Sequence, residues 1–170
     1  MTLDLDFVRS QFPAFSEPSL QGFAHFENAG GSYACGQAIE SLDRFYRQTK
    51  VQPSHHFAPS RLGGEQMDRA YERMAAWLGV GADEVHFGPS TSANTYVLAQ
   101  ALRQEFAPGD EVIVTNQDHE ANVGAWSRLE DSGITVREWQ VDPNDCELHL
   151  SGLEALLSER TRAVAFTHCS

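Results

Sequence analysis

The hydrophobic pattern divides the chain into two halves. In the first half, apolar residues recur every three or four positions over 37–49 and over 64–78, which predicts two amphipathic helices. Gly79 is well placed to end the second helix. The two apolar stripes consist of Ile39, Leu42, Phe45 and Tyr46 in the first helix, and of Met67, Tyr71, Met74, Trp77 and Leu78 in the second.

Shorter elements surround these helices. Residues 5–12 form an amphipathic piece that is followed by Pro13 and Pro18, so residues 1–22 are predicted to be an N-terminal arm with a short helix. Residues 24–26 predict a short strand. Residues 51–60 contain two prolines and two histidines and are predicted to be a loop.

From residue 83 onward, strand patterns alternate with helix patterns. The alternation predicts an α/β domain over residues 23–170, with a mainly parallel sheet, right-handed crossovers and helices on both faces. Because a parallel sheet needs a covering helix after its last strand, the domain is expected to be truncated at Ser170. The predicted order is strand 85–87, helix 91–106, turn 108–110, strand 111–115, helix 121–129, strand 134–141, helix 151–157 with a capping box of Ser151 and Glu154, and strand 162–167.

Composition limits the class of protein. Hydrophobic residues make up 41% and charged residues 21% of the chain, which is typical of a globular domain, and no apolar run is long enough to span a membrane. The net charge of -12 argues against a nucleic-acid partner. The acidic residues, Asp110 and Glu111 among them, are interpreted as a solvated surface.

Cysteine usage and the N-terminus bear on the compartment. Residues 1–10 lack the apolar region of a secretory signal. The three cysteines, Cys35, Cys146 and Cys169, lie far apart with no C-x-x-C spacing. This favours a reducing cytoplasm and buried structural thiols.

Residues 88–92, Gly-Pro-Ser-Thr-Ser, lie where a predicted strand gives way to a helix. Free N–H groups in the first turn, together with the hydroxyls, can bind an anion. The C-terminal edge of a strand is also where open α/β sheets bind ligands. An ordinary Ser/Thr N-cap explains the same residues without any ligand.

A second polar segment, residues 116–122, follows the strand at 111–115. Asp118 can cap the next helix, with His119 exposed in its first turn. Alternatively, the His119 imidazole can stack on a planar ligand held at the anion site. A third segment, residues 27–32, is either a tight turn or a place where glycines permit the close approach of a ligand.

Two other kinds of site find little support. The histidines at positions 25, 55, 56 and 119 lack the i, i+4 helical spacing of a zinc protease, so no metal site is predicted. The absence of a G-x-S-x-G segment argues against a serine hydrolase.

Four segments, in the same order, resemble the class V aminotransferase family, and within it the cysteine desulfurases and their desulfurase-like relatives. Residues 25–32 resemble the family's first strand and turn, 87–99 its phosphate-binding turn and helix, 109–126 its Gly-Asp-Glu strand with the following His and Trp, and 157–170 the strand that ends in Thr-His-x-Ser. The resemblance implies the large domain of a fold type I transferase that depends on pyridoxal phosphate (PLP). It also implies a homodimer with sites at the subunit interface.

The resemblance also implies roles for individual residues. Thr91 and Ser92 would hold the PLP phosphate, Ser90 would fill the turn before them, and His119 would stack on the pyridine ring. The residues implied on the substrate side are Asn28, Ala29 and Gly30, together with Arg61 in a loop that reaches toward the neighbouring subunit.

Lysine occurs once, at Lys50, where it is interpreted as a cation near the end of a helix. The family's Schiff-base lysine, and the aspartate that pairs with the pyridine nitrogen, are expected beyond Ser170. No catalytic residue is therefore assigned, and the 170-residue segment alone is expected to be inactive.

For the full-length parent, the resemblance implies a PLP enzyme that acts on an amino acid, by desulfuration or a related lyase reaction. An aminotransferase or an epimerase would use the same residues. From another class, a non-catalytic anion-binding or interaction domain remains an alternative.

Overall fold

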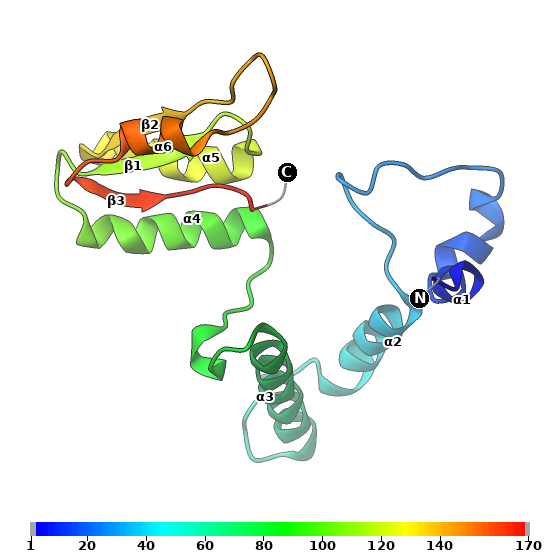
Figure 1. Ribbon diagram of the computed structural model, residues 1–170. Helices are drawn as coiled ribbons and strands as arrows, with labels where there is room; N and C mark the ends of the chain where they lie inside the picture. The colour runs from blue at the N-terminus through cyan, green and yellow to red at the C-terminus, as the bar shows by residue number, and fades with distance from the viewer. Residues whose placement is uncertain (1–2, 169–170) are drawn as a thin grey trace. The chain divides into compact units, whose positions relative to one another are not determined.

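The computed structural model describes residues 3–168, and the chain divides into two compact units, Met1–His86 and Phe87–Ser170 (Figure 1). The predicted boundary between an arm and a domain at residue 22 stays a prediction. The elements of the first unit are helix α1 (Leu5–Ser10), the short 3-10 helices η1 (Pro13–Ser16) and η2 (Pro18–Leu20), helix α2 (Gly36–Arg44), which continues as the π-helix η3 (Phe45–Thr49), helix α3 (Ala58–Leu78) and the 3-10 helix η4 (Ala82–Glu84).

Both amphipathic helices of this unit form as predicted, and Gly79 ends α3 in a left-handed conformation with φ 73°. Helix α3, however, begins at Ala58, inside the segment predicted to be a loop. Pro59 suits the first turn of a helix. The buried Ser60 hydroxyl then accepts a hydrogen bond from the His55 N–H at 2.8 Å and donates one to the Gln52 carbonyl, which fastens the preceding loop to α3.

The two short strands predicted in this part of the chain, at 24–26 and 85–87, are both wrong, because the structure assigns no strand to these residues. The apolar stripes of α2 and α3 also remain largely uncovered. Leu42 is 56% exposed, and Trp77 is 81% exposed. Among the described residues of this unit, Ala75 is the only buried hydrophobic side chain. Residues 3–86 therefore contain no cluster of buried hydrophobic side chains.

The second unit is an α/β layer. Its elements are α4 (Thr91–Leu102), the 3-10 helix η5 (Arg103–Glu105), β1 (Glu111–Thr115), α5 (Glu120–Ser127), the 3-10 helix η6 (Arg128–Ser132), β2 (Thr135–Trp139), α6 (Leu150–Leu156) and β3 (Thr161–Val164). The strands form a parallel sheet in the order β2-β1-β3. All five residues of β1 are buried, as befits a central parallel strand that is covered on both faces.

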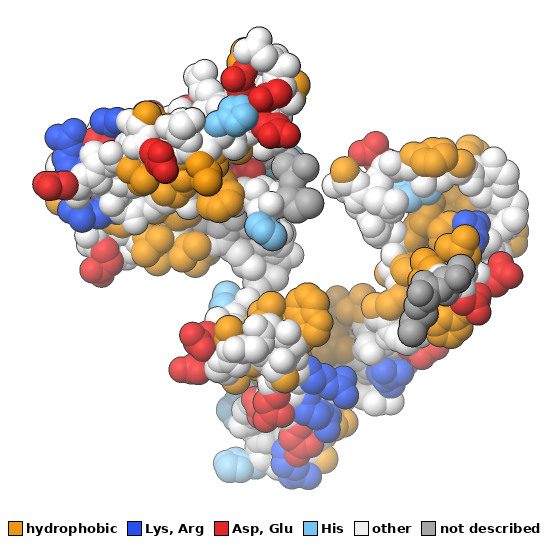
Figure 2. All heavy atoms as spheres, viewed as in Figure 1, with side chains coloured by type: hydrophobic (Ala, Val, Ile, Leu, Met, Phe, Trp, Pro, Cys, Tyr) orange, Lys and Arg blue, Asp and Glu red, His pale blue; other side chains and the backbone are white. Residues whose placement is uncertain are grey.

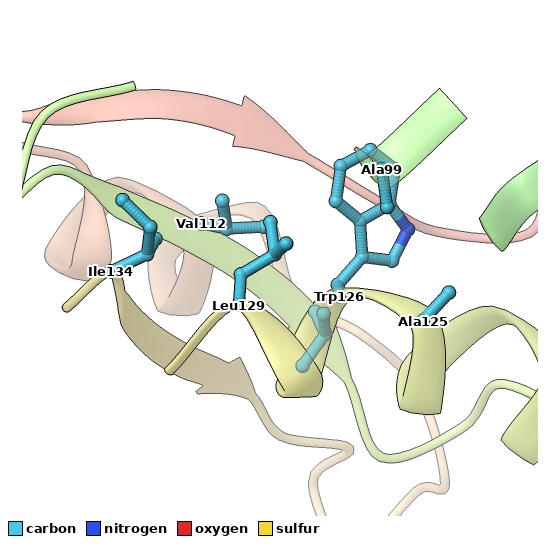
Figure 3. Close-up of a cluster of buried hydrophobic side chains, with 7 residues drawn as sticks. Ala99, Val112, Ala125, Trp126, Leu129 and Ile134 are labelled. Carbon is cyan, nitrogen blue, oxygen red and sulfur yellow. The ribbon is translucent and has the colours of Figure 1, made fainter. Parts of the chain in front are cut away.

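The core lies between one face of this sheet and helices α4 and α5 (Figure 3). It contains Ala99 of α4, Val112 and Val114 of β1, Ala125 and Trp126 of α5, Leu129, and Ile134 just before β2. On the opposite face, the Trp139 indole N–H donates to the His149 carbonyl at 3.0 Å, next to α6. The predicted α/β architecture, with helices on both faces, is therefore confirmed.

One local prediction in this unit is wrong. Helix α6 begins at Leu150 with His149 as its N-cap residue and no side-chain cap. Ser151 consequently lies inside the helix, where it does not form the predicted capping box with Glu154.

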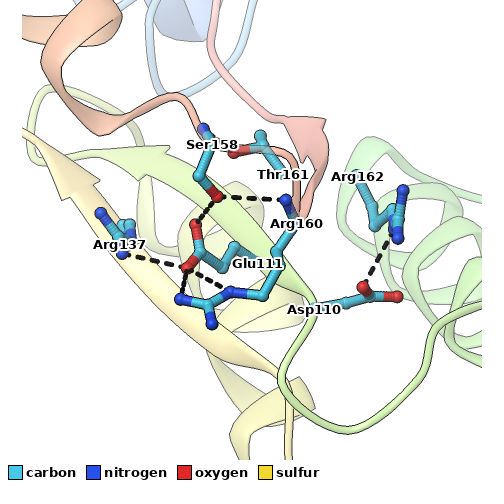
Figure 4. A network of polar contacts seen from close by, with 7 residues as sticks. All are labelled: Asp110, Glu111, Arg137, Ser158, Arg160, Thr161 and Arg162. Carbon is cyan, nitrogen blue, oxygen red and sulfur yellow. Dashed lines mark hydrogen bonds and ion pairs between the residues drawn. The ribbon is translucent and has the colours of Figure 1, made fainter.

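The amino-terminal edge of the sheet carries a network of ion pairs (Figure 4). Glu111 is 1% exposed, and its carboxylate accepts hydrogen bonds from Arg137 at 3.0 Å, Arg160 at 2.9 Å and the Ser158 hydroxyl at 2.7 Å. The neighbouring Asp110 pairs with Arg162 at 3.0 Å. These two acidic residues were expected on a solvated surface, which is wrong: they link β1 to β2 and to the segment around β3.

Hydrogen bonds and neighbouring cations lower the pKa values of both carboxyl groups, Asp110 and Glu111. The Ser158 hydroxyl, with help from Arg160 and Arg137, lowers the pKa of Glu111 below its ordinary value of 4.5. The Ala107 N–H, with help from Arg162, lowers the pKa of Asp110 below its ordinary value of 3.8. Both groups are therefore held in their charged form. We refer to the two carboxylates and their partners, Arg137, Ser158, Arg160 and Arg162, as the clasp; it lies at the edge of the sheet remote from the candidate site.

Candidate functional site

The candidate site lies at the carboxyl edge of the sheet in the second unit. Helix α4 leads into β1 and helix α5 leads out of it, and both pack on the same face, so both helices run opposite to the strand. Their first turns consequently lie at the edge where the strands end (Figure 1). Open α/β sheets bind ligands at this edge.

Ser90 is the N-cap of α4. Its hydroxyl accepts a hydrogen bond from the Ala93 N–H at 3.2 Å, and its carbonyl accepts one from the Asn94 N–H at 2.9 Å. Within the described part of the chain, the N–H groups and hydroxyls of Thr91 and Ser92 have no hydrogen-bond partner. The first turn of α4 thus presents two backbone donors and two hydroxyls, all on exposed residues.

Gly88 and Asn94 shape the approach to this turn. A Cβ atom at position 88 would overlap the Asn94 side chain, whose amide lies directly against the Gly88 backbone. A larger residue at position 88 would therefore displace the Asn94 side chain, which lies against the turn that precedes Ser90.

His119 is the N-cap of α5. Its Nδ1 accepts a hydrogen bond from the Ala121 N–H at 3.0 Å, so the neutral ring carries its proton on Nε2. The side chain is exposed. The cap therefore fixes one ring nitrogen and leaves the flat face of the imidazole available.

Asp118 does not cap α5, contrary to one of the two interpretations of this segment. Its carboxylate instead accepts hydrogen bonds from the Asn122 side chain and from the Thr167 N–H at 3.0 Å. Asn122 in turn accepts from the Trp126 indole at 3.3 Å. These contacts tie the segment after β1 to α5 and to the segment after β3.

The residues expected on the substrate side lie in the other unit. Asn28 to Gly30 form a turn in which the Gly30 N–H donates to the Glu27 carbonyl at 3.1 Å. Asn28 borders a cavity of about 290 Å³ whose lining includes the aromatic rings of Phe12, Phe15 and Tyr33. Arg61 lies in the first turn of α3 rather than in a loop, is exposed, and approaches Glu65 at 3.9 Å. These residues therefore belong to the first unit, whereas the α4 turn and His119 belong to the second.

Lys50 and the cysteines are placed as follows. Lys50 is exposed at the end of η3, consistent with a cation near a helix C-terminus. Cys35 is half-buried and Cys146 is exposed, and both are free thiols, so the prediction of a buried thiol is wrong for Cys146. Cys169 lies outside the described residues, as does Ser170.

A cluster of potential metal-ligating side chains that the sequence analysis did not predict occurs in the loop between β2 and α6. Asp142, Asp145 and His149 bring three potential ligand atoms within 4.8 Å of one another. Hydrogen bonds account for the arrangement: the His149 ring bonds to Asp145 at 2.8 Å, and Asp145 also accepts from the Glu147 N–H at 3.0 Å, the largest cause of its lowered pKa. Their spacing matches no familiar motif, which is why the pattern gave no signal.

Within residues 3–168, no helix is long and apolar enough to cross a membrane. Comparison with known proteins shows where the chain belongs. Residues 24–170 match the family described as aminotransferase class-V. An aminotransferase-like protein from Gibberella zeae is 34% identical over 99% of this chain and 42% of its own length. A cysteine desulfurase from Serratia proteamaculans is 29% identical over 100% of this chain and 43% of its own.

Among solved structures, a C-DES variant with glycine covalently linked to its PLP cofactor shares the fold, with a TM-score of 0.75 and 18% identity over 96% of this chain and 40% of that one. The chain thus spans about two fifths of the length of these two curated relatives. With the family matched over nearly all of its residues, the chain belongs to the class V aminotransferase family.

Proposed function

We propose that this chain provides the phosphate-binding and ring-facing part of a PLP site in a cysteine desulfurase-like enzyme. The cofactor follows from the class V family. The desulfurase-like activity, the amino-acid substrate, the homodimer and the cytoplasmic location belong to the proposal for the whole protein. The cysteine desulfurase relative supports the choice of reaction.

The first turn of α4 is the observation that carries the proposal. The N–H groups of Thr91 and Ser92 stand at the positive end of a 12-residue helix, next to two hydroxyl groups. This donor set suits a phosphate dianion, which accepts several charge-assisted hydrogen bonds. The residues present therefore fit the phosphate end of PLP.

His119 supplies the second part of the site. Its capped ring lies at the same edge of the sheet as the α4 turn, and the Asp118 contacts to Asn122 and Thr167 hold the segment that carries it. We assign its exposed face to the pyridine ring, which it would orient by stacking. PLP, when bound, supplies an electron sink for chemistry at the amino acid's Cα.

The remaining assignments concern the first unit. Asn28, Ala29, Gly30 and Arg61 are assigned to the substrate side. Lys50, which is exposed at the end of a helix, is assigned no covalent role. The 170-residue chain would then bind PLP reversibly and would be inactive on its own.

A PLP titration of the 170-residue chain tests these assignments. Equilibrium dialysis should show saturable binding, and replacing Thr91 by Val together with Ser92→Ala should weaken it by at least about tenfold, since each removes a charge-assisted donor. The matched control is Thr95→Val, one turn further along α4, which should bind as the parent does. An absence of saturable binding, or an equal loss in the control, would contradict the phosphate assignment.

Borohydride reduction followed by mass spectrometry tests the role of Lys50. Reduction should leave no stoichiometric covalent adduct. A stoichiometric adduct at Lys50 would overturn the assignment of this residue.

A further inference from the structure

A cleft between α2 and α3 gathers positive charge in a chain that is otherwise strongly acidic. The chain has 12 Lys and Arg residues against 24 Asp and Glu residues. Three of those 12 cations, Arg44, Arg69 and Arg73, line one cavity of about 550 Å³ in the first unit. Blue side chains accordingly gather along one side of α3 in Figure 2. The remaining lining residues are Ser41, Gln66 and Ala70, so no carboxylate lines the cavity.

Helical spacing explains why these groups face the same space. Gln66, Arg69 and Arg73 fall at i, i+3 and i+7 of α3, which places them on one face of the helix. Ser41 and Arg44 are three residues apart on α2, and the Arg44 guanidinium donates to the Ser41 hydroxyl at 2.9 Å. This contact holds the Arg44 side chain near its place on the cleft wall.

The three guanidinium groups are poorly compensated. Arg44 has only a distant contact with Glu40, at 3.9 Å between two exposed side chains. Among the described residues, neither Arg69 nor Arg73 forms an ion pair or a side-chain hydrogen bond. Like charges at i and i+4 on a helix repel one another, so Arg69 and Arg73 gain from an anion placed between them.

We infer that this cleft binds a small anion that carries a multivalent phosphate group. The guanidinium fork matches phosphate geometry with two parallel hydrogen bonds, and three forks around one cavity favour a doubly or more highly charged ligand. The cavity volume lies in the range of ordinary small-molecule pockets. The site belongs to the first unit, whereas the α4 turn that is assigned to PLP belongs to the second.

Calorimetric titration of the full 170-residue chain with inorganic pyrophosphate tests the inference. We expect saturable binding that weakens with salt and falls at least about tenfold in Arg69→Gln combined with Arg73→Gln. The matched control is Arg47→Gln, which removes a cation from η3 that is already paired with Asp43 at 2.7 Å and does not line the cleft. Circular dichroism establishes that every variant keeps its helices, and Arg69→Lys with Arg73→Lys should recover part of the affinity.

Two further arms separate this site from the PLP site and from other anions. The variant that combines Thr91→Val with Ser92→Ala should keep pyrophosphate binding at the cleft. Citrate, a multivalent carboxylate, should bind less tightly than pyrophosphate. The inference is overturned if pyrophosphate does not bind saturably, if Arg47→Gln loses as much affinity as the double variant, or if only the α4 variant loses it.

Discussion

The carboxylate of Asp118 accepts a hydrogen bond from the backbone N–H of Thr167 across 3.0 Å. These residues lie 49 positions apart, one after β1 and the other after β3. The second carboxylate oxygen holds the Asn122 side chain in the first turn of α5. One half-buried side chain thus joins the two loops and the helix at the carboxyl edge, immediately before His119.

Replacing Asp118 by Ala should lower the free energy of unfolding by about 1–2 kcal/mol, because the Thr167 N–H and the Asn122 amide lose a charged acceptor. Urea denaturation followed by tryptophan fluorescence measures this. A Trp77→Phe background removes the one tryptophan that is 81% exposed and leaves Trp126 and Trp139, both buried in the second unit, as reporters. Asp131→Ala, at an exposed position in η6, should change stability by less than about 0.5 kcal/mol. Equal midpoints for the two variants would contradict the prediction.

Glu111→Gln should lower the urea midpoint markedly. The amide removes the negative charge that Arg137 and Arg160 share, and it leaves two guanidinium groups facing a neutral buried side chain. The same substitution at Glu138, an exposed position in the neighbouring strand β2, is the control and should have little effect. If both variants unfold at the same urea concentration, the clasp contributes nothing to stability.

The same clasp predicts a loss of stability in acid. Because the pKa values of Asp110 and Glu111 are lowered in the folded state, unfolding is accompanied by proton uptake once the pH approaches their ordinary values of 3.8 and 4.5. This stabilisation is complete at neutral pH and is lost as the pH falls through and below that range. Urea midpoints at pH 7, 5, 4 and 3 should show the decline, and the decline should be smaller in Glu111→Gln. A decline of the same size in that variant would show that other groups cause it.

Gly88→Ala should disturb the turn before α4, because the added Cβ overlaps the Asn94 side chain. We expect PLP binding to weaken by about tenfold through displacement of the Ser90–Ser92 turn, a loss of about 1.4 kcal/mol. Adding Asn94→Ala to Gly88→Ala should restore much of the affinity, since the overlapping amide is removed. A double-mutant cycle measures this coupling. Additive effects would mean that the contact between these two residues does not shape the turn.

The parts of the structure that follow from local pattern were predictable. The buried run Val112–Val114 and the alternation of strands with helices gave the parallel sheet, and the hydroxyls after Gly88 gave the first turn of α4. The predictions that proved wrong concerned features that depend on contacts between residues distant in the sequence. Ala24–Phe26 has strand-like composition, yet the structure assigns no strand there. Glu111 is buried where Arg137, Ser158 and Arg160 converge on its carboxylate. Asp118 accepts a hydrogen bond from Thr167, 49 residues away. The local pattern of helix-capping residues contains no information on such a distant partner.

His119 permits a test that separates a structural cap from a role in holding the cofactor. His119→Asn keeps a side-chain acceptor for the Ala121 N–H and removes the ring, whereas His119→Ala removes both. We expect His119→Ala to cost about 1 kcal/mol of stability and His119→Asn to cost little. PLP binding should nevertheless weaken to a similar extent in both variants, because both lack the stacking face. His119→Phe, which restores a flat ring without the cap, should recover part of the PLP affinity but not the stability. If His119→Asn binds PLP as well as the parent chain does, the residue serves α5 as a cap and the ring does not contact the cofactor.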